Sequence, residues 1–236
     1  MSTVVVTGGT RGIGGAISAE LAAEGHRVIA LATTEPPAPL DGIDARICDV
    51  TDEQQVAAVF SDIGAVDVLV NNAGVSGSNR LGRTTLEEWN RNMSVNATGA
   101  FLCTRAVIDR MLERNAGKIV TVASIAGVEG APYIAAYAAS KHAVMGLMRV
   151  VAAEVAGTGV TVNSVCPTFV RTEMTVATIA NIAERTGKNL ADAEAALATA
   201  TPHGRIIETA EVVDAVMELL AGDFSGQELV LDGGPS

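Results

Sequence analysis

A short apolar run followed by a glycine-rich stretch, at the start of the chain, places the strongest constraint on the fold. Val4–Val6 is β-branched, which is typical of a strand buried on both faces. The stretch Thr7–Gly14 carries four glycines, and a helical pattern then runs from Ile13 to about Glu24. This order predicts a dinucleotide-binding unit, because glycine lets the backbone approach a pyrophosphate and a helix N-terminus attracts anions. The spacing is G-x3-G-x-G, so a simple tight turn is the alternative.

The rest of the chain repeats the alternation of strand and helix. Strands are predicted at Arg27–Ala32, Ala45–Cys48, Asp67–Val70, Lys118–Ala123, Val160–Val165 and Glu228–Leu231. Helices are predicted at Asp52–Ile63, from a capping box at Thr85 to about Asn115 with an irregularity near Gly99, from Tyr137 to about Ala156, and at Glu208–Leu220. This pattern predicts an α/β fold with one parallel, doubly wound sheet. No linker or change in composition divides the 236 residues, so we expect one domain over 1–236.

Two segments break the alternation. Glu35–Pro39 contains three prolines and cannot form an ordinary helix, so an irregular loop is expected there. Residues 172–202 hold two weak helical stretches, Met174–Arg185 and Leu190–Ala200. This segment leaves the end of a strand, which predicts a mobile substrate-binding lid rather than a surface insertion.

Composition excludes several classes of function. The formal net charge of -11 argues against a nucleic-acid partner, whose backbone is bound by clustered Lys and Arg. No apolar run approaches the roughly 20 residues that a membrane span requires. Cys48, Cys103 and Cys166 are widely spaced in apolar surroundings, which fits buried thiols rather than disulfides or a zinc site. We therefore expect no metal site, and a cytoplasmic protein.

Tyr137 and Lys141 lie four residues apart on a predicted helix and can share one site. A phenol with a pKa of about 10 is a poor base at neutral pH, and a nearby cation lowers that pKa. The pair is a candidate acid/base at an alcohol or carbonyl oxygen. The alternative is a half-buried tyrosine beside a solvated lysine.

Three other polar residues have two interpretations each. Ser124 follows the fifth strand, where turn chemistry is common but ligands also bind at the carboxyl ends of parallel strands. Asp49 follows the third strand and either contacts an adenine amino group or closes a turn before Thr51. Asn96 stands mid-helix, where asparagine is often a surface residue or a partner of nearby backbone.

Taken together, these motifs resemble the short-chain dehydrogenase/reductase family. They are Thr7-Gly8-x3-Gly12-x-Gly14, Asp49, Asn71-Asn72-Ala73-Gly74, Asn96, Ser124, Tyr137-x3-Lys141, and Pro167 with Thr172. The resemblance covers nearly the whole chain and implies an NAD(P)-dependent oxidoreductase with a seven-stranded Rossmann sheet, usually a tetramer or dimer. The resemblance also implies that the substrate is a small-molecule ketone or alcohol.

The resemblance also implies a role for each matching residue. Tyr137 would be the general acid/base, Ser124 would bond the substrate oxygen, and Asn96 would hold a water linking Lys141 to solvent. Lys141 would lower the pKa of Tyr137 and bond the nicotinamide ribose. The implied cofactor-binding residues are Gly8, Thr10, Arg11, Gly12, Ile13, Gly14, Thr33, Asp49, Val50, Asn72, Ala73, Gly74, Tyr137, Lys141, Pro167, Thr168, Val170 and Thr172.

The cofactor and substrate are less constrained. No acid stands at the end of the second strand to bond a ribose 2′-hydroxyl, whereas Arg11 and Thr33 could meet a 2′-phosphate. This favours NADP(H), while Glu35 keeps NAD(H) possible. The Ala139–Gly146 and Pro202–Arg205 stretches resemble reductases of 3-oxoacyl thioesters, polyketides and 3-hydroxy acids. The alternatives are a cyclic or sugar-like secondary alcohol as substrate, or a non-catalytic nucleotide-binding redox sensor. The expected pocket comprises Ser76–Arg80, Ile125–Ala131 and the lid.

Overall fold

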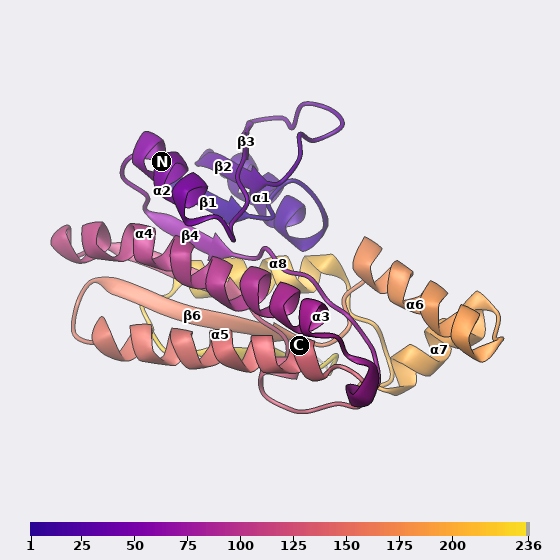
Figure 1. Cartoon of the computed structure of the whole chain (residues 1–236). Helices are drawn as coiled ribbons and strands as arrows, with labels where there is room; N and C mark the ends of the chain where they lie inside the picture. Colours follow the sequence, from indigo (N-terminus) through magenta and orange to yellow (C-terminus); the bar gives the residue numbers. More distant parts are fainter. Residues whose placement is uncertain (235–236) are drawn as a thin grey trace.

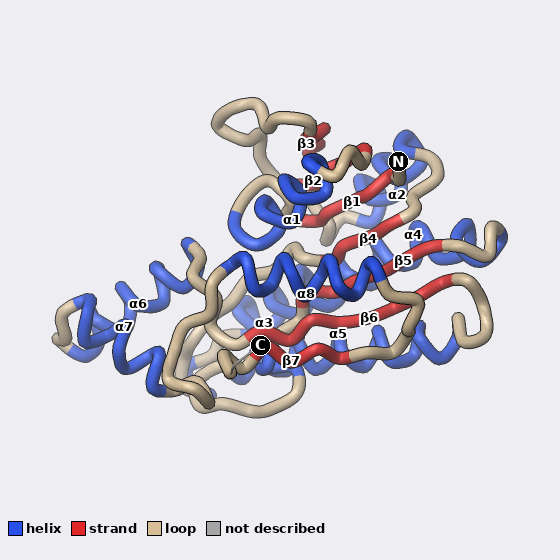
Figure 2. The backbone as a smooth tube through the Cα atoms, turned by 180° about the vertical axis from the view of Figure 1, so that it is seen from behind, coloured by secondary structure: helices blue, strands red, loops and turns tan. Residues whose placement is uncertain are grey.

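The computed structural model describes residues 1–234 and contains one seven-stranded sheet in which every neighbouring pair of strands is parallel. The strand order is β3-β2-β1-β4-β5-β6-β7, so the chain winds outward in both directions from β1 and β4 (Figure 2). The strands are β1 (Thr3–Thr7), β2 (Arg27–Ala32), β3 (Ile43–Ile47), β4 (Val68–Asn71), β5 (Gly117–Val122), β6 (Val160–Pro167) and β7 (Glu228–Leu231). The doubly wound α/β fold is thereby confirmed.

Helices cover both faces of the sheet (Figure 1). The α-helices are α1 (Gly12–Ala23), α2 (Glu53–Ile63), α3 (Leu86–Asn92), α4 (Gly99–Glu113), α5 (Ala135–Glu154), α6 (Glu173–Thr186), α7 (Leu190–Thr199) and α8 (Thr209–Ala221). Shorter turns are η1 (Leu81–Arg83), η2 (Met93–Thr98) and η3 (Ile125–Gly127). Within the described residues, none of these helices is both long and apolar enough to cross a membrane.

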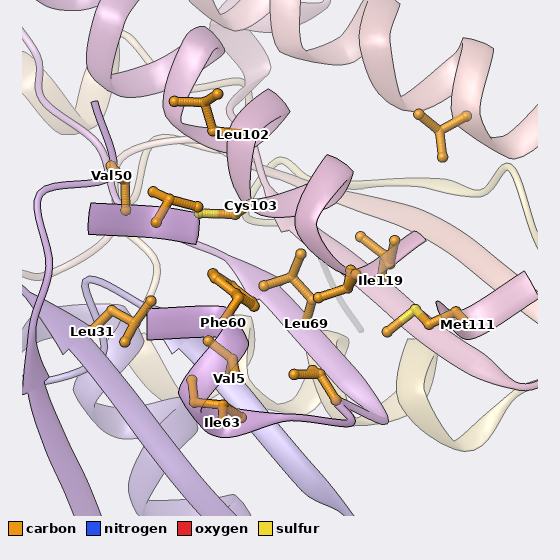
Figure 3. Packing of buried hydrophobic residues seen from close by; sticks show 14 of the residues in the cluster. Val5, Leu31, Val50, Phe60, Ile63, Leu69, Leu102, Cys103, Met111 and Ile119 are labelled. Atoms are coloured by element: carbon orange, nitrogen blue, oxygen red, sulfur yellow. The ribbon is translucent and has the colours of Figure 1, made fainter. Parts of the chain in front are cut away.

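The alternation of side chains along the strands builds two cores. Val5 of β1 packs with α2, α4 and α5 on one face, in a cluster that includes Phe60 and Met111 (Figure 3). Val4 and Val6 point to the other face and pack with α1 and α8. A strand that is buried on both faces must be apolar at every position, which is why the β-branched runs located the central strands. The three cysteines are buried and free, as predicted.

Several element boundaries differ from the sequence prediction. The helix that carries Tyr137 begins two residues earlier, at Ala135, and β3 spans Ile43–Ile47 rather than Ala45–Cys48. The capping box at Thr85 and Glu88 is confirmed. The helix after it runs from Leu86 to Glu113 but is irregular, because residues Met93–Thr98 form a π-helical turn between α3 and α4. The proline-rich segment forms no helix or strand, as expected.

The α6–α7 pair forms a small cluster of its own beside the sheet. Ile179 of α6 packs against Ala193 and Leu197 of α7 and against Ile206. Both views show the pair projecting from the end of the molecule at which β6 ends (Figures 1 and 2). The two helices predicted for residues 172–202 are therefore present.

Candidate active site

The glycine-rich turn after β1 has a shape that only glycine permits. Gly8 and Gly12 have φ of 62° and 56°, a region that L side chains rarely adopt. A Cβ added at Gly14 would lie 2.3 Å from the carbonyl oxygen of Gly8, so the helix start presses against the turn. Asn72 holds this arrangement, since its Nδ2 donates to the carbonyls of Thr7 and Gly8 at 3.0 and 3.2 Å.

The outer side of the same turn is open and suits an anion. A Cβ built at Gly12 would meet no atom within 4 Å. The first turn of α1 has no acidic side chain, and Arg11 at its N-cap provides no capping hydrogen bond from its side chain. The free backbone N–H groups and the positive end of the helix dipole therefore face open space, so the residues present fit the pyrophosphate of a dinucleotide.

Gly14→Ala should destabilise the fold by about 1–3 kcal/mol and abolish dinucleotide binding, because its methyl would push against fixed backbone. Gly146→Ala is the matched control: it lies inside α5 with nothing within 4 Å of an added Cβ, and should stabilise by about 0.5–1 kcal/mol. Urea unfolding and equilibrium binding measure both effects. Equal stabilities for the two variants would contradict the close packing of the turn.

Ser124, Tyr137 and Lys141 converge at the carboxyl edge of the sheet. Ser124 follows β5 and caps η3, while the other two lie on the first turns of α5. The Nζ of Lys141 is 5.8 Å from the centre of the Tyr137 ring and donates to the carbonyl of Val122 at 3.1 Å. The close approach needs Gly127, whose added Cβ would lie 2.8 Å from the carbonyl oxygen of Lys141. The structure thus brings three of the four predicted catalytic side chains together.

The electrostatics of this cluster differ from the sequence prediction in one respect. Burial raises the pKa of Tyr137, and the nearby Ser124 hydroxyl opposes the rise. Burial also lowers the pKa of Lys141 from 10.5 to about 8. Desolvation disfavours the charged form of each group, and here it outweighs the expected stabilisation of a phenolate. The phenol therefore holds its proton at neutral pH.

Asn96 lies beside this cluster, but its side chain contacts the protein rather than solvent. Its Oδ1 accepts from the backbone N–H of Val75 at 2.8 Å, and its Nδ2 donates to the Val75 carbonyl and to Ser140 Oγ at 2.9 and 2.8 Å. Ser140 in turn donates to the carbonyl of Tyr137 at 2.7 Å. The side chain thus joins α5 to the loop after β4, while the water-holding role of Asn96 stays a prediction.

Other predicted cofactor residues contact the backbone around the site. Asp49 accepts from the backbone and hydroxyl of Thr51 at 2.9 and 2.8 Å, which is the turn interpretation. Asn72 holds the glycine turn rather than facing outward, and the backbone N–H of Ala73 donates to Thr7 Oγ1 at 2.9 Å. Thr172 is the N-cap of α6, where its side chain accepts from the backbone N–H of Thr175.

The remaining predicted residues lie along the same edge. Thr33 is exposed just beyond β2, whereas Val50 and Val170 are buried.

Gly74 is close to the cluster, since an added Cβ would be 3.8 Å from Lys141 Nζ. Thr168, which follows Pro167 at the end of β6, has a buried hydroxyl with no hydrogen-bond partner among the described residues, so it suits a bound polar group. Arg11 forms an ion pair with Glu173 at 3.6 Å. Thr10 and Ile13 flank the glycine turn.

Sequence reasoning assigned no individual role to four residues that shape the site. Thr7 Oγ1 accepts the backbone N–H groups of Asn72 and Ala73. Ser140, Gly127 and Glu173 have the contacts described above. Ser140 adjoins Lys141 in the sequence and could have been noticed there, but the partner of Glu173 lies at the other end of the chain.

Comparison with known proteins agrees with this geometry. A family model described as short chain dehydrogenase matches residues 2–183. The 3-oxoacyl-(acyl-carrier-protein) reductase FabG of Vibrio cholerae is 37% identical over 243 residues, covering 98% of this chain and 95% of that protein.

Two solved structures extend the comparison. A variant of actinorhodin polyketide ketoreductase, solved with NADPH, superposes with a TM-score of 0.91 at 34% identity, covering 99% of this chain and 96% of that one. The ligand-free aldohexose dehydrogenase of Thermoplasma acidophilum gives a TM-score of 0.88 at 30% identity, covering 99% and 93%. Because sequence, fold and the Ser124–Tyr137–Lys141 cluster agree, this chain belongs to the short-chain dehydrogenase family.

Proposed function

We propose that this protein is an NADPH-dependent reductase of a ketone in a 3-oxoacyl thioester or a related β-keto compound. The observation that carries the proposal is the cluster of Ser124, Tyr137 and Lys141 at the sheet edge that also bears the open glycine turn. The similarity to a 3-oxoacyl reductase and to a polyketide ketoreductase supports the substrate class.

The side chains account for the proton that must accompany the hydride. NADPH, when bound, supplies a hydride to the carbonyl carbon. Tyr137 donates its phenolic proton to the carbonyl oxygen, and its raised pKa keeps that proton available at neutral pH. Ser124 donates a hydrogen bond to the same oxygen and orients the ketone. The ammonium of Lys141 stabilises the phenolate that forms, in a buried site where a charge acts strongly.

The cofactor would be held by the open turn and the residues along the sheet edge. The N-terminus of α1 suits the pyrophosphate, and Arg11 with Thr33 suits a 2′-phosphate. Lys141 would bond the nicotinamide ribose, while the unpartnered hydroxyl of Thr168 and the capping residue Thr172 suit the carboxamide. NADH remains the alternative, with Glu35 on the proline-rich loop as a partner for the ribose.

The test is a panel of ketones assayed with each cofactor by the loss of reduced-nicotinamide absorbance. A 3-oxobutyryl thioester, a cyclic ketone and, in the oxidative direction, an aldohexose represent the competing substrates. We expect the highest kcat/KM for the thioester with NADPH. A higher kcat/KM with the aldohexose would favour the second candidate, a sugar-type dehydrogenase. The structural similarity to an aldohexose dehydrogenase supports this candidate. Binding without turnover of any substrate would favour a redox sensor.

We also propose that residues 172–202 form a lid over the substrate. Support comes from the α6–α7 pair, which has its own small apolar cluster and projects beside the end of β6. Without ligand, α6 and α7 should exchange their amide hydrogens faster than the sheet, and NADPH with a substrate analogue should slow that exchange, because closure excludes water. Mass-spectrometric hydrogen exchange measures this, and sheet-like protection in the free protein would contradict it.

Three further proposals concern the whole molecule. Residues 1–236 form one domain, which the continuous seven-stranded sheet supports. The chain assembles as a homotetramer or homodimer, a proposal supported by the exposed apolar side chains of Phe101 on α4 and Val150 on α5. A cytoplasmic location is supported by the three free, buried cysteines.

A further inference from the structure

The glycine turn and the start of the lid are joined by one ion pair. Arg11 is the N-cap of α1, and Glu173 is the first residue of α6. Their charged atoms, Nη1 and Oε2, are 3.6 Å apart, and the side chains are 81% and 79% exposed. A solvent-exposed pair of this kind is weak, so a stronger anion can take its place.

Each partner has one charged contact within the described residues, and it is the other partner. Arg171, which is close to Glu173 in the chain, is already paired with Glu194 and Glu208 at 2.9 and 3.0 Å. Glu173 lies in the first turn of α6, a position that suits a carboxylate because of the helix dipole. Among the described residues, Glu173 is therefore the carboxylate that competes for the Arg11 guanidinium.

We propose that Glu173 is a specificity-determining residue that competes with the 2′-phosphate of NADPH for Arg11. This inference rests on the proposed NADPH-dependent function. An NADPH molecule must exchange the Arg11–Glu173 pair for an Arg11–phosphate contact, whereas NADH has no phosphate there and leaves the pair intact. Glu173 thus weakens the binding of NADPH and leaves that of NADH unchanged. Its removal sharpens the preference for NADPH.

The test is equilibrium binding of NADPH and NADH, followed by nicotinamide fluorescence at low ionic strength. Glu173→Gln should tighten NADPH up to about fivefold and leave NADH unchanged. Glu184→Gln is the matched control, because Glu184 is an exposed acid of the same helix and its change removes the same charge. That control should alter neither cofactor's dissociation constant.

The double variant Arg11→Ala/Glu173→Gln should bind NADPH as weakly as Arg11→Ala alone. The inference is overturned if Glu184→Gln tightens NADPH equally, or if Glu173→Gln still tightens NADPH when Arg11 is alanine. The inference about Glu173 fails, while the proposed function stands, if Arg11→Ala weakens NADPH binding but Glu173→Gln has no effect on it. A parent protein that does not bind NADPH contradicts the proposed function itself, so the two failures are distinguishable.

Discussion

Tyr137→Phe should reduce turnover by about 10² to 10⁴-fold while leaving the affinity for NADPH and the stability nearly unchanged. The change removes only the phenolic oxygen, and general acid catalysis typically accounts for a factor of this size. Because the pKa of Tyr137 is raised, the parent side chain holds its proton at neutral pH. The loss of turnover in the variant therefore reports the loss of a proton donor. Steady-state kinetics and equilibrium binding measure the two halves of the prediction.

Tyr133→Phe is the matched control. It removes the same oxygen from a tyrosine four residues earlier, a residue that is 58% exposed. Its backbone carbonyl, which accepts from the N–H of Asn79 at 2.7 Å, is retained. Tyr133→Phe should keep most of the turnover. Comparable turnover in Tyr133→Phe and Tyr137→Phe would contradict the role of Tyr137 as the proton donor.

Lys141→Met should lower turnover by about 10²-fold or more and yet stabilise the fold. The pKa of Lys141 falls from 10.5 to about 8 because its charge is buried, which corresponds to about 3 kcal/mol of unfavourable burial. Its hydrogen bond to the Val122 carbonyl, worth about 1 kcal/mol, is lost in the variant. The expected net gain in the free energy of unfolding at pH 7 is therefore about 2 kcal/mol.

The gain should depend on pH in a defined direction. Below about pH 8 the lysine is charged in both the folded and the unfolded state, so the folded parent bears the full unfavourable free energy of the buried charge. Between about 8 and 10.5 the unfolded state binds more protons, and the stability of the parent rises with pH. The advantage of Lys141→Met should thus shrink across this window.

Urea unfolding at pH 7 and at pH 10 measures this change, with Lys188→Met as the control. Lys188 is exposed between α6 and α7, so its replacement should leave the free energy of unfolding unchanged at both pH values. A loss of stability in Lys141→Met at pH 7 would contradict the account of a buried, unfavourable charge.

The fold was largely predictable because central strands of a parallel sheet must be apolar on both faces. Edge strand β3 was placed two residues late, because Asp44 and Arg46 give it a polar sequence that resembles a loop. Gly99 indicated an irregularity in the helix that carries Asn96, but the sequence did not predict that it takes the form of a π-helical turn at Met93–Thr98. Its register depends on tertiary contacts of that side chain with Val75 and Ser140, which a sequence pattern does not show.

The site was predictable where spacing alone brings groups together. Tyr137 and Lys141 share a helix face, and Ser124 meets them because parallel strands end at one edge. The individual contacts of Asp49 and Asn72 were not predictable. Some motif side chains contact the ligand directly, whereas others hold the backbone turn that contacts the ligand. The sequence motif does not distinguish these two roles.

The central claim, ketone reduction by hydride transfer from NADPH, is tested most directly by isotope transfer. The protein is incubated with a 3-oxobutyryl thioester and NADPH that carries deuterium at the nicotinamide carbon donating the hydride. Both faces of that carbon are labelled in separate experiments, and the product is analysed by mass spectrometry. We predict one deuterium at the former carbonyl carbon from one of the two labelled cofactors, with the hydroxyl proton drawn from water. A reduced product without deuterium from either cofactor, or no reduced product at all, would contradict the account.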